Sequence, residues 1–482
     1  MIGALVELAA VASMLVGGMF LLWSFGAKGW GVAPWGFATG AFLTIAVGFV
    51  QAATPLTGSP IVTMSVVAFG PVAWWWREMA RGRATPVSWV VSGTASAVVG
   101  GSVALHRGLH TFAYHVDSME YLGVGALLVH NNYAAAVIPD QMDKRFLAVP
   151  LLHASAHLAG EYYLASVTPL LACAVVGIVG WLVLTRARPI VGDRGAWWLA
   201  ALGMVALATM NRFDFHAIYL NGHLFTALGV LAAAGSCWLV ASGSSSLGRA
   251  PAAVAVLAII ALVLTRAEGT FLALAAVLPV VATSSVGRRV RALLLGTVGL
   301  STALWYGFTA AIKISRDYPL GPSGPMLVAG LAMVAAAVVV ANGRWAGTWR
   351  RSPFFYEGGI AAIVLLLAYV KPSILTISID ALYNNAYGWF SSWGAAFEIV
   401  TMLVIAAVFV SRGQGLGSIR APVTIFLPLA MFLAYARGSG YRTADADSLN
   451  RMLVEVVPLA IVYVLMSAVE NRSEAKAPAE AA

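Results

Sequence analysis

One short stretch of the chain brings acidic, histidine and tyrosine side chains close together, TFAYHVDSMEYLGVG at residues 111–125. It contains His115, Asp117, Glu120 and Tyr121. A carboxylate in this setting can take a proton from a hydroxyl group. Asp117 and Glu120 also have the D-x-x-E form of a capping box, in which Asp117 caps a helix and Glu120 reaches back to its start. Both interpretations stay open, since a capped helix start is also a rigid mount for a catalytic acid.

Charged residues recur at three later points, each at the end of an apolar run. They are Arg212, Asp214, His216 and His223 in TMNRFDFHAIYLNGHLF, Arg266 and Glu268 in LTRAEG, and Arg451 and Glu455 in SLNRMLVEVVP. A planar guanidinium binds phosphate oxygens through two donors, so Arg212, Arg266 and Arg451 are candidates for a phosphate site. The structural alternative is that each arginine only extends its head to the membrane surface. Glu455 follows Arg451 by one helical turn, which predicts an ion pair.

The elements that must position these residues are membrane helices. Of the 482 residues, 60% are hydrophobic and 10% are charged, whereas a soluble domain carries roughly 25% charged residues. The sequence therefore predicts an all-α, polytopic transmembrane bundle in contact with membrane lipids. Its net charge of +9 is spread singly between apolar runs, so nucleic acid is not an expected partner. About fifteen spans are expected, near 2–24, 34–53, 60–76, 87–106, 162–185, 195–211, 217–241, 251–265, 270–286, 293–312, 325–342, 357–374, 393–411, 421–436 and 453–469.

The loops between these runs differ in charge. Short basic loops, RARPIVGDR (186–194) and GRRVR (287–291), fall on one side when alternate loops are assigned to opposite sides. The positive-inside rule makes that side cytoplasmic. The longest loop, residues 107–161, falls on the other side and is too polar to span, which predicts short helices lying in the interface. We therefore expect a multi-pass protein of the cell membrane with its active site on the extracytoplasmic side.

The order of these segments resembles the GT-C superfamily of membrane glycosyltransferases. The D-x-x-x-Y motif of that superfamily corresponds to Asp117–Tyr121, and its R-P-E-G pattern corresponds to Arg266–Gly269, with alanine in place of proline. Its arginine-then-proline final helix corresponds to Arg451 and Pro458. The likeness covers roughly 87–470, so that 1–86 would be additional N-terminal transmembrane helices and 471–482 a disordered cytoplasmic tail. Two features depart from the family pattern: about three spans precede the Asp loop where one is usual, and no large C-terminal outer domain follows.

The resemblance implies an inverting glycosyltransferase of cell-envelope or cell-wall biosynthesis. Its donor would be a polyprenyl-phosphate-linked sugar, and its acceptor an extracytoplasmic glycan, lipid or protein. The implied catalytic residues are Asp117 as base and Glu120 as a secondary acid or orienting partner. Arg212, Arg266 and Arg451 would bind the donor phosphate, and His115, Tyr121, His223 and Glu268 would bind substrate. Some members of the superfamily bind a divalent cation near this aspartate, but no ligand cluster in the sequence assigns one.

Two other classes of function stay open. One is a lipid-linked saccharide flippase or another transporter, and the other is a scaffolding membrane subunit without activity. A transporter is expected to place ionisable residues deep within several spans. Only Glu7 and Glu455 lie clearly inside apolar runs, whereas the other charges gather at one face. This distribution favours an enzyme.

Overall fold

The computed structural model describes residues 2–54, 59–109, 116–130, 146–243, 247–283, 285–321, 323–342, 355–387, 393–410, 414–436 and 448–480. The regular elements in those residues are helices, which confirms the predicted all-α class. In chain order they are α1 (Ile2–Ser24), α2 (Val32–Ala52), α3 (Pro60–Ala80), α4 (Trp89–Leu109), α5 (Val116–His130), α7 (Ala148–His153), η2 (Ala154–Ala159), α8 (Val167–Ala208), α9 (Asn211–Ile218), α10 (Gly222–Ala241), α11 (Ala250–Val263), α12 (Gly269–Ala282), α13 (Arg288–Ser315), α14 (Ser323–Asn342), α16 (Phe355–Val370), α17 (Ser373–Leu382), η3 (Tyr383–Tyr387), α18 (Ala395–Val410), η4 (Gln414–Leu416), α19 (Gly417–Ala436), α20 (Ser448–Met452), η6 (Leu453–Glu455) and α21 (Val457–Glu480).

Among the described residues, six helices are long and apolar enough to cross a membrane. They are α1, α2, α4, α8, α10 and α13, and the bent pair Leu449–Glu455 and Val457–Glu470 makes a seventh when it is counted as one span. Each apolar run named above falls on a helix. However, α11 and α12 have only 14 residues each, or about 21 Å of helix against a hydrocarbon core of about 30 Å. The expected count of about fifteen spans is therefore not confirmed.

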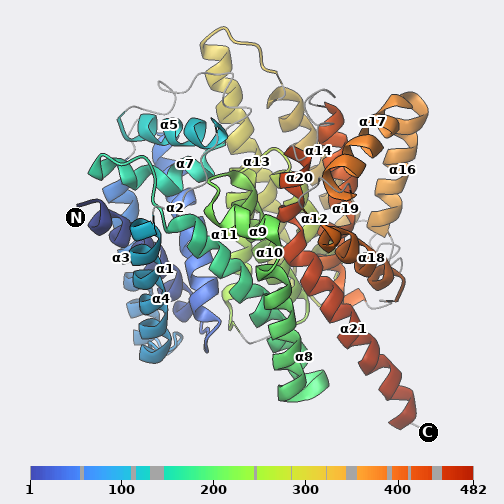
Figure 1. Cartoon of the computed structure of the whole chain (residues 1–482), viewed down its shortest axis with the longest axis horizontal. Helices are drawn as coiled ribbons and strands as arrows, with labels where there is room; N and C mark the ends of the chain where they lie inside the picture. Colours follow the sequence, from blue (N-terminus) through green and yellow to red (C-terminus); the bar gives the residue numbers. More distant parts are fainter. Residues whose placement is uncertain are drawn as a thin grey trace.

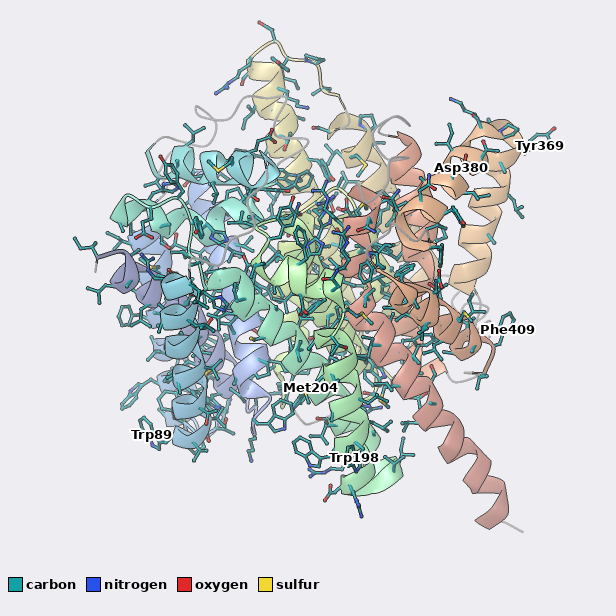
Figure 2. The ribbon with its side chains drawn as sticks, viewed as in Figure 1. Trp89, Trp198, Met204, Tyr369, Asp380 and Phe409 are labelled. Atoms are coloured by element: carbon teal, nitrogen blue, oxygen red, sulfur yellow. The ribbon has the colours of Figure 1, made fainter. Side chains whose placement is uncertain are left out.

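The bundle has two distinct ends. Helices α5 and α7, from the predicted outer loop 107–161, lie at the upper end in Figure 1, and the C-terminus lies at the lower end. Helix α8 combines two predicted runs and turns near the lower end at Gly192, which has a φ of 75°. Figure 2 shows Trp89 and Trp198 at this lower end, where they are 82% and 69% exposed. Exposed tryptophans of this kind are typical of a membrane interface.

Helices α1 and α2 pack closely because glycines face one another. A Cβ on Gly18 would lie 1.7 Å from the carbonyl oxygen of Gly36, and one on Gly40 would lie 1.7 Å from that of Met14. Small residues allow membrane helices to approach in this way. The pair also packs against α8 and α11, and one hydrophobic core extends from Ala10 to Val469. The N-terminal helices within 1–86 thus share the core of the remaining chain.

A buried ion network joins α1 to the end of α4 and to the residues just before α8. The Glu7 carboxylate is fully buried, and it accepts hydrogen bonds from Arg107 Nη1 at 2.8 Å and from the Ser166 backbone N–H at 2.6 Å. Arg107 also donates two hydrogen bonds to Glu161. Because a buried carboxylate needs a counter-charge and donors, Arg107 and Ser166 account for the acid that the sequence places inside an apolar run.

The last span is broken where Pro458 enters it. Helix α20 passes into the short η6, and the chain bends by 48° before α21. Pro458 has no backbone N–H, and its ring crowds the preceding turn, so a continuous helix is disfavoured there. Helix α21 then runs to Glu480, so residues 471–480 are helical in the segment for which the sequence predicts a disordered tail. The break leaves Arg451 and Glu455 on the short limb formed by α20 and η6.

Candidate functional site

Helix α5 lies over the turn between α9 and α10. Ser118 Oγ donates a hydrogen bond of 2.9 Å to the carbonyl oxygen of Leu220. Tyr121, one turn further along α5, is 3% exposed and packs against Leu220. A Cβ added to Gly222 would lie 3.5 Å from the Tyr121 hydroxyl and 3.6 Å from Arg266 Cδ. Two residues predicted for the site, Tyr121 and Arg266, therefore meet at the start of α10.

The start of α10 is fixed by a side-chain cap. Asn221 Oδ1 accepts a hydrogen bond of 3.0 Å from the backbone N–H of His223. An asparagine at this position satisfies one of the free N–H groups at a helix start. The cap holds the His223 side chain, which is 2% exposed, inside the bundle.

His223 lies between a carboxylate and a guanidinium. Its Nδ1 is 2.6 Å from Glu455 Oε1, and its Nε2 is 3.3 Å from Arg266 Nη1. Arginine can only donate, so Nε2 must accept and Nδ1 must carry the proton that it donates to Glu455. The geometry therefore fixes the tautomer of a neutral imidazole.

Arg266 is held from a second side by Glu268. Its Nε donates to Glu268, and the same Nε lies 3.4 Å from Glu455 Oε1. Burial opposes the charge, but the two carboxylates raise the pKa of Arg266 above its usual value. The tight turn that carries both residues requires Gly269, because a Cβ there would lie 1.9 Å from the Leu262 carbonyl oxygen.

Two more arginines approach this network from α9 and α20. Arg451 Nη1 donates a hydrogen bond of 2.8 Å to the Tyr219 hydroxyl, and its guanidinium lies 6.0 Å from the centre of that ring. The Arg212 guanidinium lies 5.7 Å from the centre of the Phe215 ring. Burial and the neighbouring charge of Arg451 both lower the pKa of Arg212. Two cations thus stand close together in this neighbourhood.

His216 lies among these cations. It is fully buried, and its ring centre is 5.7 Å from that of His223. Burial, followed by the charges of Arg212, Arg451 and Arg266, lowers its pKa to about 3. Neither ring nitrogen has a hydrogen-bond partner within the part of the chain that the structure describes. His216 is therefore a neutral imidazole with an unused donor and an unused acceptor.

The structure brings most of the predicted site residues together. Tyr121, His223, Arg266, Glu268, Arg212 and Arg451 belong to one neighbourhood formed by α5, α9, α20 and the starts of α10 and α12. Glu120 is half-buried on α5. Asp117 lies in the first turn of α5, one residue after its start at Val116 rather than in front of the helix. The side chain of Asp117 and the whole of His115 lie outside the described residues.

Three members of the neighbourhood were not among the predicted site residues. They are His216, Tyr219 and Glu455. The sequence does point to Glu455, because it is an acid inside an apolar run. His216 precedes His223 by seven residues, so a single helix would place both on one face. The two histidines are not on one continuous helix in the structure, because the chain turns between them at residues 219–221.

No metal site is visible in the ranges that the structure covers: no three His, Cys, Asp or Glu side chains converge there. Comparison of the chain with protein-family models, with curated protein sequences and with solved structures gave no match.

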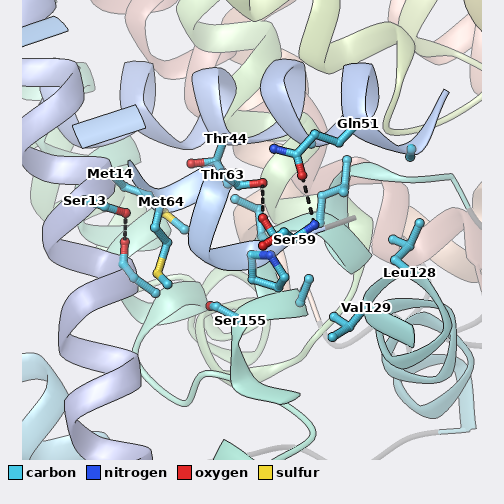
Figure 3. A pocket seen from close by; sticks show the side chains of 17 residues that line it. Ser13, Met14, Thr44, Gln51, Ser59, Thr63, Met64, Leu128, Val129 and Ser155 are labelled. Carbon is cyan, nitrogen blue, oxygen red and sulfur yellow. Dashed lines mark hydrogen bonds between the residues drawn. The ribbon is translucent and has the colours of Figure 1, made fainter. Parts of the chain in front are cut away.

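Among the described residues, one cavity lies beside the candidate site and another lies beside the N-terminal helices. The larger, of about 280 Å³, is an apolar groove between α18, α19 and α21, and Val456 and Val457 of its wall directly follow Glu455. The smaller, of about 30 Å³, lies between α1, α2, α3 and α5, and Figure 3 shows Thr44, Gln51 and Thr63 around it. The smaller cavity has room for about one water molecule. Only the larger can hold part of a substrate.

Proposed function

We propose that this chain is a membrane glycosyltransferase of the GT-C type, which transfers a sugar from a polyprenyl-phosphate donor to an extracytoplasmic glycan, lipid or protein. The observation that carries the proposal is the meeting of Arg212, Arg266 and Arg451 within an apolar bundle, near the helix that bears Asp117. The order of the sequence motifs supports the same function. The proposal includes a GT-C-like arrangement with about fifteen membrane-embedded segments and the site on the outer side.

The donor has two chemically different parts, and the site offers a surface for each. The arginines supply donors and positive charge for a phosphate. The groove beside Glu455 is lined almost entirely by apolar side chains, and Ile405 and Phe409 along it are exposed at the surface of the bundle. A polyprenyl chain entering from the lipid would lie in this groove with its phosphate toward Arg451. The adjacency of groove and cations favours a lipid phosphate as the donor.

The reaction requires one proton transfer and one displacement. Asp117 would take the proton of the acceptor hydroxyl as its oxygen bonds to the anomeric carbon of the sugar. The bond from that carbon to the phosphate oxygen breaks, and the electron pair leaves with the polyprenyl phosphate. Arg266 and Arg451 would stabilise the charge that grows on this phosphate. Glu268 and His223 hold Arg266 in place, which limits the reorganisation needed during the reaction.

A flippase would use the same phosphate site but would not need a base. Glu7 and Glu455, two acids within apolar runs, are engaged, Glu7 by Arg107 and Glu455 by His223 and Arg266. Such fixed ion pairs are expected of structural and orienting groups rather than of a mobile relay. Asp117 is therefore the residue that separates the two functions.

The test is Asp117→Asn in the full-length chain in its native membranes. Asn keeps the size and hydrogen bonding of a residue in the first helical turn, and loses only about 0.3–1 kcal/mol of charge–dipole energy. If Asp117 is the base, turnover should fall by roughly 10²–10⁴-fold. Mass spectrometry of membrane lipids should then show a polyprenyl-phosphate sugar that accumulates with the variant and is consumed with the wild type. Glu120→Gln is the matched control, because it changes the neighbouring carboxylate in the same way.

Unchanged consumption of lipid-linked sugars in Asp117→Asn would refute the assignment of the base. A loss confined to Glu120→Gln would move the role to Glu120. Unchanged consumption in both variants would favour the flippase or the scaffolding subunit.

A further inference from the structure

The two buried histidines of the site differ in how their ring nitrogens are used. His223 donates from Nδ1 to Glu455 and accepts at Nε2 from Arg266, so both nitrogens are engaged inside the protein. His216 is equally buried, and neither of its nitrogens is engaged by a described residue. Buried polar atoms in folded proteins are almost always hydrogen-bonded, and exceptions concentrate at functional positions. The difference leaves His216 with a donor and an acceptor that are available to a ligand.

The surroundings of His216 define the chemistry of that partner. Arg212 and Arg451 stand beside it, and Arg212 has a buried Nε without a hydrogen-bond acceptor among the described residues. A group that satisfies Arg212 must be an acceptor, and a negative charge is favoured between two guanidinium groups. An oxyanion bound between the two guanidinium groups would lie next to the ring N–H of the neutral His216, which can donate a further hydrogen bond to it.

We propose that His216 binds the phosphate of the ligand directly by donating a ring N–H to a phosphate oxygen, whereas His223 is a positioning residue that acts through Arg266. The inference rests on the proposed function, because it assigns the phosphate group of the lipid donor to this place. The role predicted for His223 in substrate binding thereby passes to His216. The shared chemistry is an anionic phosphate group, carried by a lipid or free in solution, and the apolar groove behind Glu455 commits the source to a lipid phosphate.

The experiment compares His216→Phe with His223→Phe in the purified full-length chain in lipid nanodiscs. The probes are farnesyl phosphate and inorganic phosphate, with a dissociation constant measured for each. Loss of a hydrogen bond to an anion should weaken binding of farnesyl phosphate at least about tenfold in His216→Phe. His216→Gln, whose amide N–H can still donate, should recover part of that loss. Wild-type protein should prefer farnesyl phosphate to inorganic phosphate, and equal affinities would refute the lipid source.

Thermal stability separates a ligand contact from a structural residue. Phenylalanine is similar in size to histidine and has no buried nitrogen to satisfy, so His216→Phe should unfold at the wild-type temperature or above it. His223→Phe should unfold at a lower temperature, because it removes a partner from the buried Glu455 carboxylate. Equal losses of stability in the two variants would make His216 structural and overturn the inference.

A double-mutant cycle tests the division of roles. In an Arg266→Gln background, His223→Phe should cause no further loss of farnesyl phosphate binding, since its effect passes through Arg266. His216→Phe should still weaken binding in that background. If Arg266→Gln and Arg451→Lys weaken binding but His216→Phe does not, the role of His216 is wrong and the proposed function stands. If neither arginine variant changes binding, the proposed function fails with it.

Discussion

The two carboxylates that hold Arg107 provide a matched pair for measuring a buried ion pair. Glu7 is fully buried, whereas the Glu161 side chain is 37% exposed. Replacement by glutamine keeps the size of either side chain and removes its charge. The two substitutions thus differ mainly in how much water can replace the lost partner.

The expected magnitudes follow from the hydrogen bonds. Glu7 accepts from Arg107 Nη1, from the Ser166 backbone N–H and from Ser166 Oγ. A glutamine presents one oxygen and one N–H₂ group, so at least one of these donors is left facing another donor. A buried donor without an acceptor costs about 1–3 kcal/mol. Arg107 keeps Glu161 as counter-ion, so the full penalty for an unpaired buried charge does not apply, and we expect a loss of about 2–3 kcal/mol in Glu7→Gln.

Glu161→Gln should cost less than about 1 kcal/mol, because a partly exposed ion pair contributes little in water. The assay is reversible unfolding of the purified protein in mixed detergent micelles, with the free energy of unfolding compared across wild type and both variants. Equal losses, or a larger loss in Glu161→Gln, would refute the reasoning from burial. Arg107 lies in the last turn of α4, before the segment that leads to Asp117. A loss of lipid-linked sugar consumption in Glu7→Gln alone would show that the network also positions that segment.

Two further predictions concern topology and pH. In a background in which the exposed Cys173 is replaced by serine, Met119→Cys on α5, which is 42% exposed, should react with an impermeant maleimide in intact cells. Asp193→Cys, next to the turn of α8, should react only after permeabilisation, and the reverse pattern would invert the topology. Burial, aided by His157, lowers the pKa of His153 to about 3, and its Nδ1 accepts from the Leu164 N–H. The unfolded chain, with an ordinary histidine pKa of about 6.5, binds the proton first, so His153 should destabilise the protein as the pH falls from about 6.5 towards 3, by up to about 1.4 kcal/mol per pH unit. His153→Gln, which can still accept from Leu164, should reduce that slope, and an unchanged slope would contradict the assignment.

The sequence predicted where the charged groups of the site lie along the chain. Arg266 and Glu268 stand at the end of an apolar run and before Gly269, and the structure places them in a tight turn. Runs of apolar residues predicted the positions of the helices well, because a helix has the same apolar composition whether it faces lipid or the core of the protein. The number of spans stays unconfirmed, because helices as short as α11 and α12 depend on local backbone geometry that composition does not encode. The turn at Gly192, by contrast, falls inside the loop predicted at 186–194.

The partners of the charged groups were less predictable than their positions. Helical spacing suggested that Glu455 would pair with Arg451, but the chain passes into η6 at Leu453 and bends before Pro458. The structure gives Glu455 two partners from other helices, His223 and Arg266. Which residues meet across helices depends on packing angles and on breaks in the helix, and residue spacing describes a single regular helix only.

Arg107, Arg266 and Arg212 differ in whether carboxylates form ion pairs with them. Arg107 has Glu7 and Glu161, and Arg266 has Glu268 and Glu455, so each guanidinium is neutralised within the protein. Among the described residues, the guanidinium of Arg212 lies over the ring of Phe215, and its charged neighbour is Arg451. Burying a cation in an apolar bundle costs free energy unless an anion lies beside it. A neutralised arginine can be explained by structure alone, whereas Arg212 lies beside another cation and an imidazole without a described partner, and there the proposed phosphate would supply the missing negative charge.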